Sequence, residues 1–425
     1  MQKKWKFKLL FILANLGVFY ITPVMFQFPV NQFPVFYFFF RAVLLGMLIL
    51  LLPYFFNDFI NKAKSKNKSG WLSICIVFLF VFYLLELFLT FYPETNGKND
   101  TYCSKTWMYY YWKQNKEGFR DIDFESMPLN KPSIVFAGDS YTEGHGIKDP
   151  SKRVSDLCRN RFPDFNVYNI GKCGMDINDE IKLITHLPVH SDIIVLQICS
   201  NDWDYLYKPV SMLPSVNHLL LAEVSAFSLT KYSVLLNYFQ SRFENLRENY
   251  FLTEIDNQYK SKILNAFKIN KAAAINSNNE LKVLKFAVEH TKLQDDSIEV
   301  QLFRMLKEYN TSLKVMTDTV LFNRYLDKLS YLKAFCDQHM IKLVVVPYPN
   351  LDKFSMNVTS KYTNRYLTKL IKDRGIDCLD TYPDLKKASL SSYTVNNIDM
   401  HINEKASAIV ADVVISHIKK MILKR

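Results

Sequence analysis

Glycine is scarce in this sequence, at 11 of 425 residues. The positions that keep it are therefore expected to need its backbone freedom or the space left by its missing side chain. No two of the seven cysteines are separated by two residues, so zinc-ribbon and thioredoxin-like redox patterns are absent. No basic helix with a base-reading face is visible either. The sequence therefore predicts no metal, no cofactor and no nucleic-acid partner.

Apolar residues, in contrast, are abundant near the N-terminus. Three apolar stretches occupy residues 9–28, 35–56 and 71–92. Each has roughly the 20 residues that an α-helix needs to cross a bilayer. No small-residue cleavage site follows the first stretch, so a cleaved signal peptide is a poor fit. We expect an anchor of three transmembrane helices; buried helices of a soluble protein are the alternative.

The formal net charge of +12 is unevenly placed. Lysines are concentrated in MQKKWKFK at the N-terminus and in NKAKSKNKSG between the second and third stretches, whereas QFPVNQF between the first two has no charge. Positive charge marks the cytoplasmic ends of membrane helices. Both lysine-rich segments, and the N-terminus, are therefore expected in the cytoplasm, and residues 93–425 in the periplasm or outside the cell.

Two charged residues, Arg41 and Glu86, lie inside the predicted spans. For Arg41 we expect its long side chain to reach an interface, and for Glu86 either a contact between helices or a position nearer the membrane surface than the span suggests. A functional intramembrane pair is the alternative.

Six cysteines follow the third stretch. An even number permits disulfides in an oxidising compartment, but spacing alone assigns no pairs. Buried free thiols are the expectation for most of them.

Apolar runs of strand length alternate with helix-compatible segments beyond about residue 100. The helical patterns are Arg153–Arg161 and Ile177–Leu187. The strand-like runs are Ser133–Ala137, Asn166–Asn169, Asp192–Ile198, Ile341–Pro347 and Ile376–Leu379. Short buried strands alternating with helices predict an α/β fold, with a parallel sheet covered on both faces.

The alternation stops between about residues 205 and 325. No strand pattern is convincing there, while Leu219–Tyr250 and Ser297–Lys333 have helical patterns. We expect a mostly helical insertion within the domain formed by residues 93–425.

Glycines and polar residues follow the first three predicted strands. GDSYTEG begins at Gly138, NIGKCG covers residues 169–174 and CSND covers residues 199–202. Ligands of an open α/β sheet bind at the carboxyl ends of its strands, so these segments should meet in one crevice. A fourth polar segment, NNIDMHINEKA, covers residues 396–406.

These segments contain the groups that acyl transfer requires. Ser140 can act as the nucleophile, with His401 as its base and Asp399 fixing the imidazole. The N–H groups of Ser140 and Gly174 and the side-chain amide of Asn201 can donate to an oxyanion.

Together the four segments resemble the SGNH, or GDSL-type, hydrolase family. The family's Gly-Asp-Ser, Gly, Gly-x-Asn-Asp and C-terminal Asp/His blocks correspond to those around Ser140, Gly174, Asn201 and His401. The resemblance covers about residues 131–210 and 335–420, and implies a three-layer, flavodoxin-like fold. It also implies the roles given above for the nucleophile, the base and the oxyanion donors.

The sequence departs from the family pattern at two places. Asp399-Met400-His401 is Asp-x-His where the family often has Asp-x-x-His, and Cys199 stands where the third block usually has glycine. Within the first block, Asp139 is expected to orient the loop. Glu143 and His145 are expected on its solvated face, with substrate contact as the alternative.

Three functions fit these residues. The first is a membrane-anchored esterase that removes acyl groups, expected to be O-acetyl, from glycans or lipids of the cell envelope. The second is an O-acyltransferase of envelope polysaccharide, which uses the same residues and would receive its acyl group from a membrane donor protein. The third is a non-catalytic scaffold that keeps the fold for partner binding.

Overall fold

The computed structural model describes residues 43, 46–47, 70–96, 101–128, 130–187, 189–204, 206, 233–243, 315–316, 318–349, 357–385 and 390–423. These residues form two compact units. One contains the described residues up to Lys113 together with 233–243, and the other contains the remainder, from Gln114 onward.

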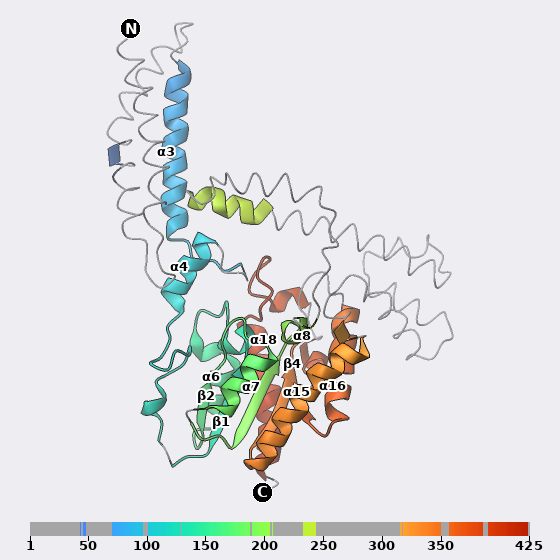
Figure 1. Ribbon diagram of the computed structural model, residues 1–425. Coiled ribbons are helices and arrows are strands. Elements are labelled where there is room, and N and C mark those ends of the chain that lie inside the picture. The colour runs from blue at the N-terminus through green and yellow to red at the C-terminus, as the bar shows by residue number, and fades with distance from the viewer. Residues whose placement is uncertain are drawn as a thin grey trace, which may run out of the picture. The chain divides into compact units, whose positions relative to one another are not determined.

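The second unit is built on a five-stranded sheet, shown in Figure 1. Its strands are β1 (Ser133–Gly138), β2 (Asn166–Asn169), β3 (Ile193–Ile198), β4 (Lys342–Pro347) and β5 (Asp377–Cys378). All neighbouring strands are parallel, in the order β2-β1-β3-β4-β5. This order is that of flavodoxin-like sheets, so the predicted parallel α/β fold is confirmed.

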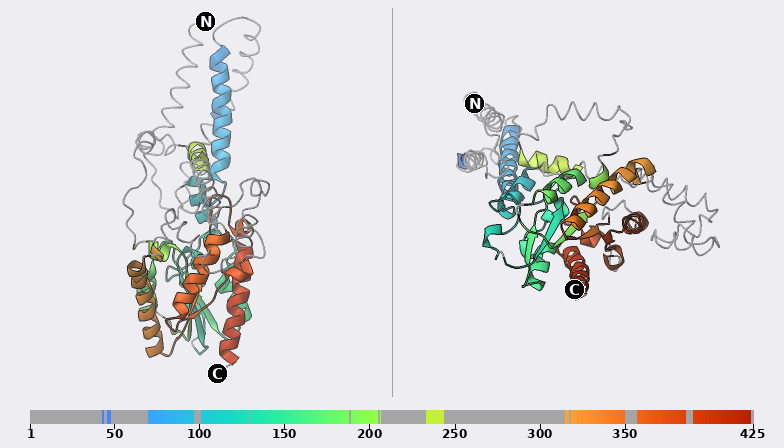
Figure 2. Two further views of the ribbon diagram at one scale, coloured as in Figure 1. Left: turned by 90° about the vertical axis from the view of Figure 1, so that its right-hand side faces the viewer. Right: turned by 60° about the horizontal axis from the view of Figure 1, so that its bottom comes forward.

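Helices cover both faces of this sheet (Figure 1, Figure 2). Those on one face are α7 (Ile177–Thr185), α15 (Thr319–Gln338) and α16 (Asn357–Lys372), and those on the other are α6 (Val154–Arg161) and α18 (Glu404–Leu423).

The side chains of successive strand residues pack into hydrophobic cores on opposite faces of the sheet. Val135 and Ile194 pack with α7 and α15, whereas Ile134 and Ile193 pack with α6 and α18. Full burial of one such side chain contributes about 1.5–3 kcal/mol, so both faces must be covered.

Shorter turns complete the unit. They are α5 (Ser140–Glu143), α8 (Asn201–Asp204), α17 (Tyr382–Leu385), and the 3-10 turns η1 (Phe124–Ser126), η2 (Pro150–Lys152) and η5 (Leu390–Tyr393). Both α5 and α8 begin directly after a strand, at the carboxyl edge of the sheet where sequence placed the polar segments.

The first unit combines α3 (Gly70–Thr90), α4 (Tyr102–Tyr111) and a helix over residues 234–243. Glu86 is buried and accepts hydrogen bonds from the N–H of Val234, at 2.9 Å, and from the hydroxyl of Ser233. Its carboxylate therefore caps the third helix. This is the helix contact expected for Glu86, while Arg41 lies outside the described residues.

The predicted membrane spans fall only partly on the described chain. The stretch at 9–28 lies outside it, the stretch at 35–56 is represented by residues 43, 46 and 47, and the stretch at 71–92 coincides largely with α3. Among the residues that the structure describes, no helix is long and apolar enough to cross a bilayer.

The insertion predicted at about 205–325 is also described only in part. Residues 234–243 are helical, as expected, and α15 begins within the predicted Ser297–Lys333 segment. The remainder lies outside the described residues. None of the six described cysteines that follow α3 is joined in a disulfide, and all except Cys173 are buried.

Candidate active site

Ser140 is the first residue of a short helical turn at the end of β1. Asp139 caps the turn, because its Oδ1 accepts the N–H of Tyr141 at 3.0 Å. The first N–H groups of a helical turn have no partner within it. The sequence Gly-Asp-Ser thus places the Ser140 hydroxyl, together with the first N–H groups of the turn, at the carboxyl edge of the sheet.

His401 is held by a tight loop just before α18. Asn396 closes the loop, because its side-chain oxygen accepts the N–H of Asp399 at 2.9 Å. Asp399 Oδ1 then accepts both the backbone N–H of His401, at 3.1 Å, and its imidazole Nδ1–H, at 2.6 Å. This turn explains how a spacing of Asp-x-His still brings the carboxylate to the ring.

The structure brings Ser140, His401 and Asp399 into one line of contacts. Nε2 of His401 lies 2.8 Å from Oγ of Ser140, while its Nδ1 faces Asp399. With Nδ1 donating to the carboxylate, Nε2 is left as an acceptor for the serine proton. Burial opposes ionisation of Asp399, but contacts with His145 and His401 outweigh it and hold the carboxyl pKa well below its usual range. The aspartate is therefore an anion beside the imidazole.

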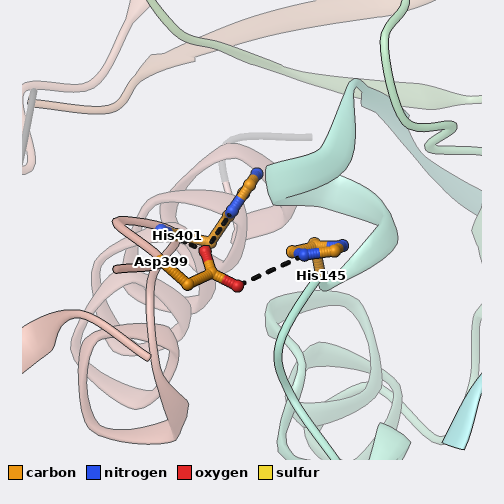
Figure 3. Close-up of side chains that lie close together, drawn as sticks. All are labelled: His145, Asp399 and His401. Carbon is orange, nitrogen blue, oxygen red and sulfur yellow. Dashed lines mark hydrogen bonds and ion pairs between the residues drawn. The ribbon is translucent and has the colours of Figure 1, made fainter. Parts of the chain in front are cut away.

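A second histidine contacts the same aspartate, as Figure 3 shows. Nε2 of His145 lies 3.2 Å from Oδ2 of Asp399, and the His145 ring lies 4.4 Å from the His401 ring. His145 is 1% exposed, so the predicted solvated position is wrong. Burial lowers its pKa, with the Asp399 contact opposing, so the ring is neutral at neutral pH.

Glu143 is also buried, and the prediction of a solvated face is wrong for it as well. One carboxylate oxygen accepts the backbone N–H of Cys173, which lies in the segment after β2. Burial raises the pKa of Glu143, and that hydrogen bond opposes the rise. Both acidic and basic side chains of this loop thus turn inward.

Gly171 lets the two loops meet backbone to backbone. A Cβ at this position would lie 2.5 Å from the backbone nitrogen of Glu143 and 2.6 Å from Cβ of Thr142. Both distances are below any normal contact, so a side chain at residue 171 would force the loops apart. The glycine fixes the segment after β2 against the turn that carries Ser140.

The other two predicted oxyanion donors, Gly174 and Asn201, follow β2 and β3, the strands on either side of β1. Gly174 has φ of +79°, which favours glycine, and a Cβ there would meet no atom within 4 Å. Asn201 is the first residue of α8, after β3. The structure does not describe the side chain of Asn201, so the role of its amide stays a prediction.

Cys199 connects the end of β3 to the turn that begins with Ser140. Its thiol donates to Oδ2 of Asp139 at 3.2 Å, and its N–H donates to Asp202 Oδ2 at 2.8 Å. Asp139 therefore contacts two strand ends, which agrees with an orienting role.

Arg120 braces the same loop and was not singled out from the sequence. Its guanidinium, 2% exposed as a residue, donates to the carbonyls of Gly144 at 2.5 Å and Ile147 at 2.6 Å. Burial, together with nearby Arg153, lowers the pKa of Arg120 to about 9, which still leaves it charged at neutral pH. Arginine that binds backbone carbonyls has no sequence pattern, so no signal could have identified it.

Two side-chain groups among the described residues have ligand atoms close enough to hold a metal ion. One is His145, Asp399 and His401, and the other is Asp139, Cys199 and Asp202. Members of both groups already contact one another or nearby N–H groups, and these contacts would compete with an ion.

No family model and no curated protein sequence matches this chain. Eleven chains of solved structures match this chain, and the three described below are 11–12% identical to it. A lipolytic protein of the G-D-S-L family from Veillonella parvula is 11% identical, with a TM-score of 0.31 over 67% of this chain and 96% of its own.

A lipase from a goat rumen metagenome is 12% identical, with a TM-score of 0.31 over 67% of this chain and 96% of that one. An acetylxylan esterase from Geobacillus stearothermophilus is also 12% identical, with a TM-score of 0.31 over 68% and 95%. These neighbours are lipolytic and ester-cleaving enzymes. At such scores the likeness does not identify a substrate, so the functional argument rests on the site itself.

Proposed function

We propose that this chain is a serine esterase of the SGNH type that removes small acyl groups from glycans or lipids of the cell envelope. The observation that carries the proposal is the continuous contact from Ser140 through His401 to Asp399, at 2.8 and 2.6 Å. An activated serine needs a base within hydrogen-bond distance and a third group that orients the base.

In the first half of the proposed reaction, His401 Nε2 takes the hydroxyl proton as Ser140 Oγ attacks the ester carbonyl. The N–H groups of Ser140 and Gly174 and the Asn201 amide donate to the oxyanion, and Asp399 stabilises the imidazolium. The tetrahedral intermediate collapses by breaking the bond to the alcohol oxygen, which takes the proton from His401. The products are a free alcohol and an acyl ester of Ser140.

In the second half, His401 removes a proton from water, which attacks the acyl-enzyme. Collapse breaks the bond to Ser140 Oγ, which regains its proton from His401, and the carboxylic acid leaves. The choice of a small acyl group, acetyl above all, is supported by crowding: Ser140 is 8% exposed, and the Tyr141 ring lies 5.1 Å from the His401 ring.

The proposal places the site outside the cytoplasm, on a chain anchored in the membrane. Support for this comes from the sequence alone, namely the lysine-rich segments that flank uncharged apolar stretches. Acylated glycans and lipids of the envelope are the esters proposed as substrates on that side.

The test is labelling of the purified full-length chain with a fluorophosphonate probe, which reacts covalently with activated serines. Wild type should label, whereas Ser140→Ala and His401→Ala should lose the signal. Ser151→Ala is the matched control, because Ser151 is exposed in η2 of the same unit and should leave labelling unchanged.

A folded wild-type chain that does not label, and does not hydrolyse p-nitrophenyl acetate, would overturn the proposal in favour of a scaffold. Labelling with acyl transfer only to an added polysaccharide, and none to water, would replace the esterase by the acyltransferase.

A further inference from the structure

We propose that His145 is a positioning residue of this site, which holds the second oxygen of Asp399 and connects the catalytic pair to the loop that carries Gly174. The inference rests on the proposed esterase function and extends it by one residue. Neither the Gly-Asp-Ser pattern nor the C-terminal Asp/His pattern assigns His145 a role.

Asp399 receives one imidazole on each of its oxygens. Oδ1 accepts His401 Nδ1 at 2.6 Å, and Oδ2 lies 3.2 Å from His145 Nε2. Figure 3 shows the carboxylate with the two rings on either side. Asp399 is 0% exposed, so with both rings in place neither of its oxygens is open to bulk water. The second ring thus limits rotation of the carboxyl group, which keeps Oδ1 directed at His401.

The position of the proton on His145 follows from its neighbours. A neutral imidazole carries one N–H, and the carboxylate oxygen requires it on Nε2. The approach of Nε2 to Oδ2 departs from ideal hydrogen-bond angles, so the attraction is mainly that of the N–H dipole for the negative oxygen. Nδ1 is then an acceptor, and the Cys173 thiol lies 4.0 Å from it.

Cys173 connects these contacts to the loop that carries Gly174. It directly precedes Gly174, and its backbone N–H donates to Glu143. One short stretch, residues 142–145, therefore contacts the Gly171–Gly174 segment at its backbone, at Glu143 and at His145. The same stretch reaches Asp399 through His145. Residues 142–145 thereby contact both the aspartate that orients His401 and the loop that carries Gly174.

A buried histidine can also be structural only, and substitutions distinguish the two roles. Glutamine carries an amide N–H near the position of Nε2, whereas leucine is similar in size and has no N–H. If His145 positions Asp399 through this N–H, His145→Gln should keep function that His145→Leu loses.

The matched control is His417, whose Nε2 lies 2.6 Å from Asp377 Oδ2 in the same unit. His417→Leu removes a histidine–aspartate contact without touching Ser140, Asp399 or His401.

The first readout is hydrolysis of p-nitrophenyl acetate by the full-length chain. His145→Leu should lower kcat by about 10–100-fold, the loss typical of residues that orient a metal ligand through a hydrogen bond, with KM within about twofold. His145→Gln should stay within about threefold of wild type, and His417→Leu should be unchanged. Equal losses in the Gln and Leu variants, or no loss in Leu, would overturn the inference.

The second readout does not depend on turnover. The proton between His401 Nδ1 and Asp399 Oδ1 should give a far-downfield proton NMR signal in wild type, displaced or broadened in His145→Leu and retained in His145→Gln. A wild-type chain without this signal would also overturn the inference.

The two proposals fail separately. A chain that shows the signal and its displacement but neither labels nor hydrolyses the ester would lose the esterase and keep the positioning role. A chain that hydrolyses the ester, with unchanged kcat and signal in His145→Leu, would keep the esterase and lose the positioning role.

Discussion

Two histidine–aspartate pairs of the α/β unit have the same contact distance in very different surroundings. His401 and Asp399 lie 2.6 Å apart at the carboxyl edge of the sheet, and His417 and Asp377 lie 2.6 Å apart between α18 and β5. The side chain of Asp399 is 0% exposed, whereas that of Asp377 is 40% exposed.

The difference shows what makes such a pair useful. At the first pair, a serine hydroxyl lies on the far side of the imidazole and a second imidazole lies on the far side of the carboxylate. At the second pair, both side chains are partly exposed to solvent, and such pairs contribute about 0–1 kcal/mol to stability. A short distance is therefore common to both, and the closed surroundings distinguish the catalytic candidate.

The largest effect is expected for Asp399→Asn, compared with Asp377→Asn. The amide can leave His401 in the wrong tautomer, so kcat for p-nitrophenyl acetate should fall by about 10³–10⁴-fold. Asp377→Asn should change kcat by less than about twofold. Comparable losses of kcat in the two variants would mean that the buried surroundings of Asp399 do not give it a larger role in catalysis than Asp377.

The next largest effect is expected at the groups that donate to the oxyanion. Asn201→Ala should lower kcat by about 10²–10³-fold, the usual loss for one oxyanion donor. Fluorophosphonate labelling should slow in parallel, because the probe places an oxygen in the same position. An unchanged rate would remove Asn201 from the site and leave the donors to backbone N–H groups.

How much of this could be predicted from sequence depends on the range of the contacts. Each strand and the polar segment that follows it are local patterns, so β1 with Ser140 and β3 with Asn201 were predictable. His401 and Ser140 are 261 positions apart, yet both stand in recognisable segments. The fold then brings those segments together at one edge.

Local sequence patterns did not predict the position of a polar side chain whose partner lies in another segment of the chain. His145 lies between two glycines in a polar stretch, which favours a solvated loop, and Asp399, which it contacts when buried, belongs to a distant segment. Arg120 binds backbone carbonyls, which every residue possesses, so no pattern could point to it.

A third expected effect concerns stability, and compares Asp399 with Glu180, a second buried carboxyl group. Glu180, on α7, is 0% exposed, and neither of its oxygens has a hydrogen-bond partner in the described part of the chain. Burial first, and then the charge of Asp202, raise its pKa well above the usual range. The opposite holds for Asp399, whose pKa is lowered.

The signs follow from these directions. The pKa of Glu180 is higher in the folded chain than the value of about 4.3 for glutamate in an unfolded chain. Its contribution to stability is therefore fully present below about pH 4.3, and it is lost as the pH rises through the pKa of the folded chain. For Asp399, stability is present above the unfolded aspartate value and is lost as pH falls through the lower folded value.

Glu180→Gln should therefore match wild type in melting temperature near pH 4 and exceed it at pH 8, since the amide cannot ionise. Each 1 kcal/mol gained corresponds to about 2–4 °C. Glu404→Gln is the control, because it makes the same change at an exposed position of α18. A lower melting temperature for Glu180→Gln at pH 8 would show that the wild-type carboxyl is ionised and paired.

The smallest effect is expected for His417→Gln. Loss of a half-exposed pair should cost at most about 1 kcal/mol, and a double-mutant cycle with Asp377→Asn measures the contact itself. A coupling of several kcal/mol would mean that this pair is as well shielded as the one at the active site.

The close approach at Gly171 has a consequence for mutagenesis libraries. With no room for even a methyl group beside Glu143 and Thr142, selection on esterase activity should return one amino acid at residue 171. Its neighbour Lys172 is exposed and should vary freely. The contrast between an invariant and a tolerant adjacent codon would outline, from sequencing reads alone, where the two loops touch.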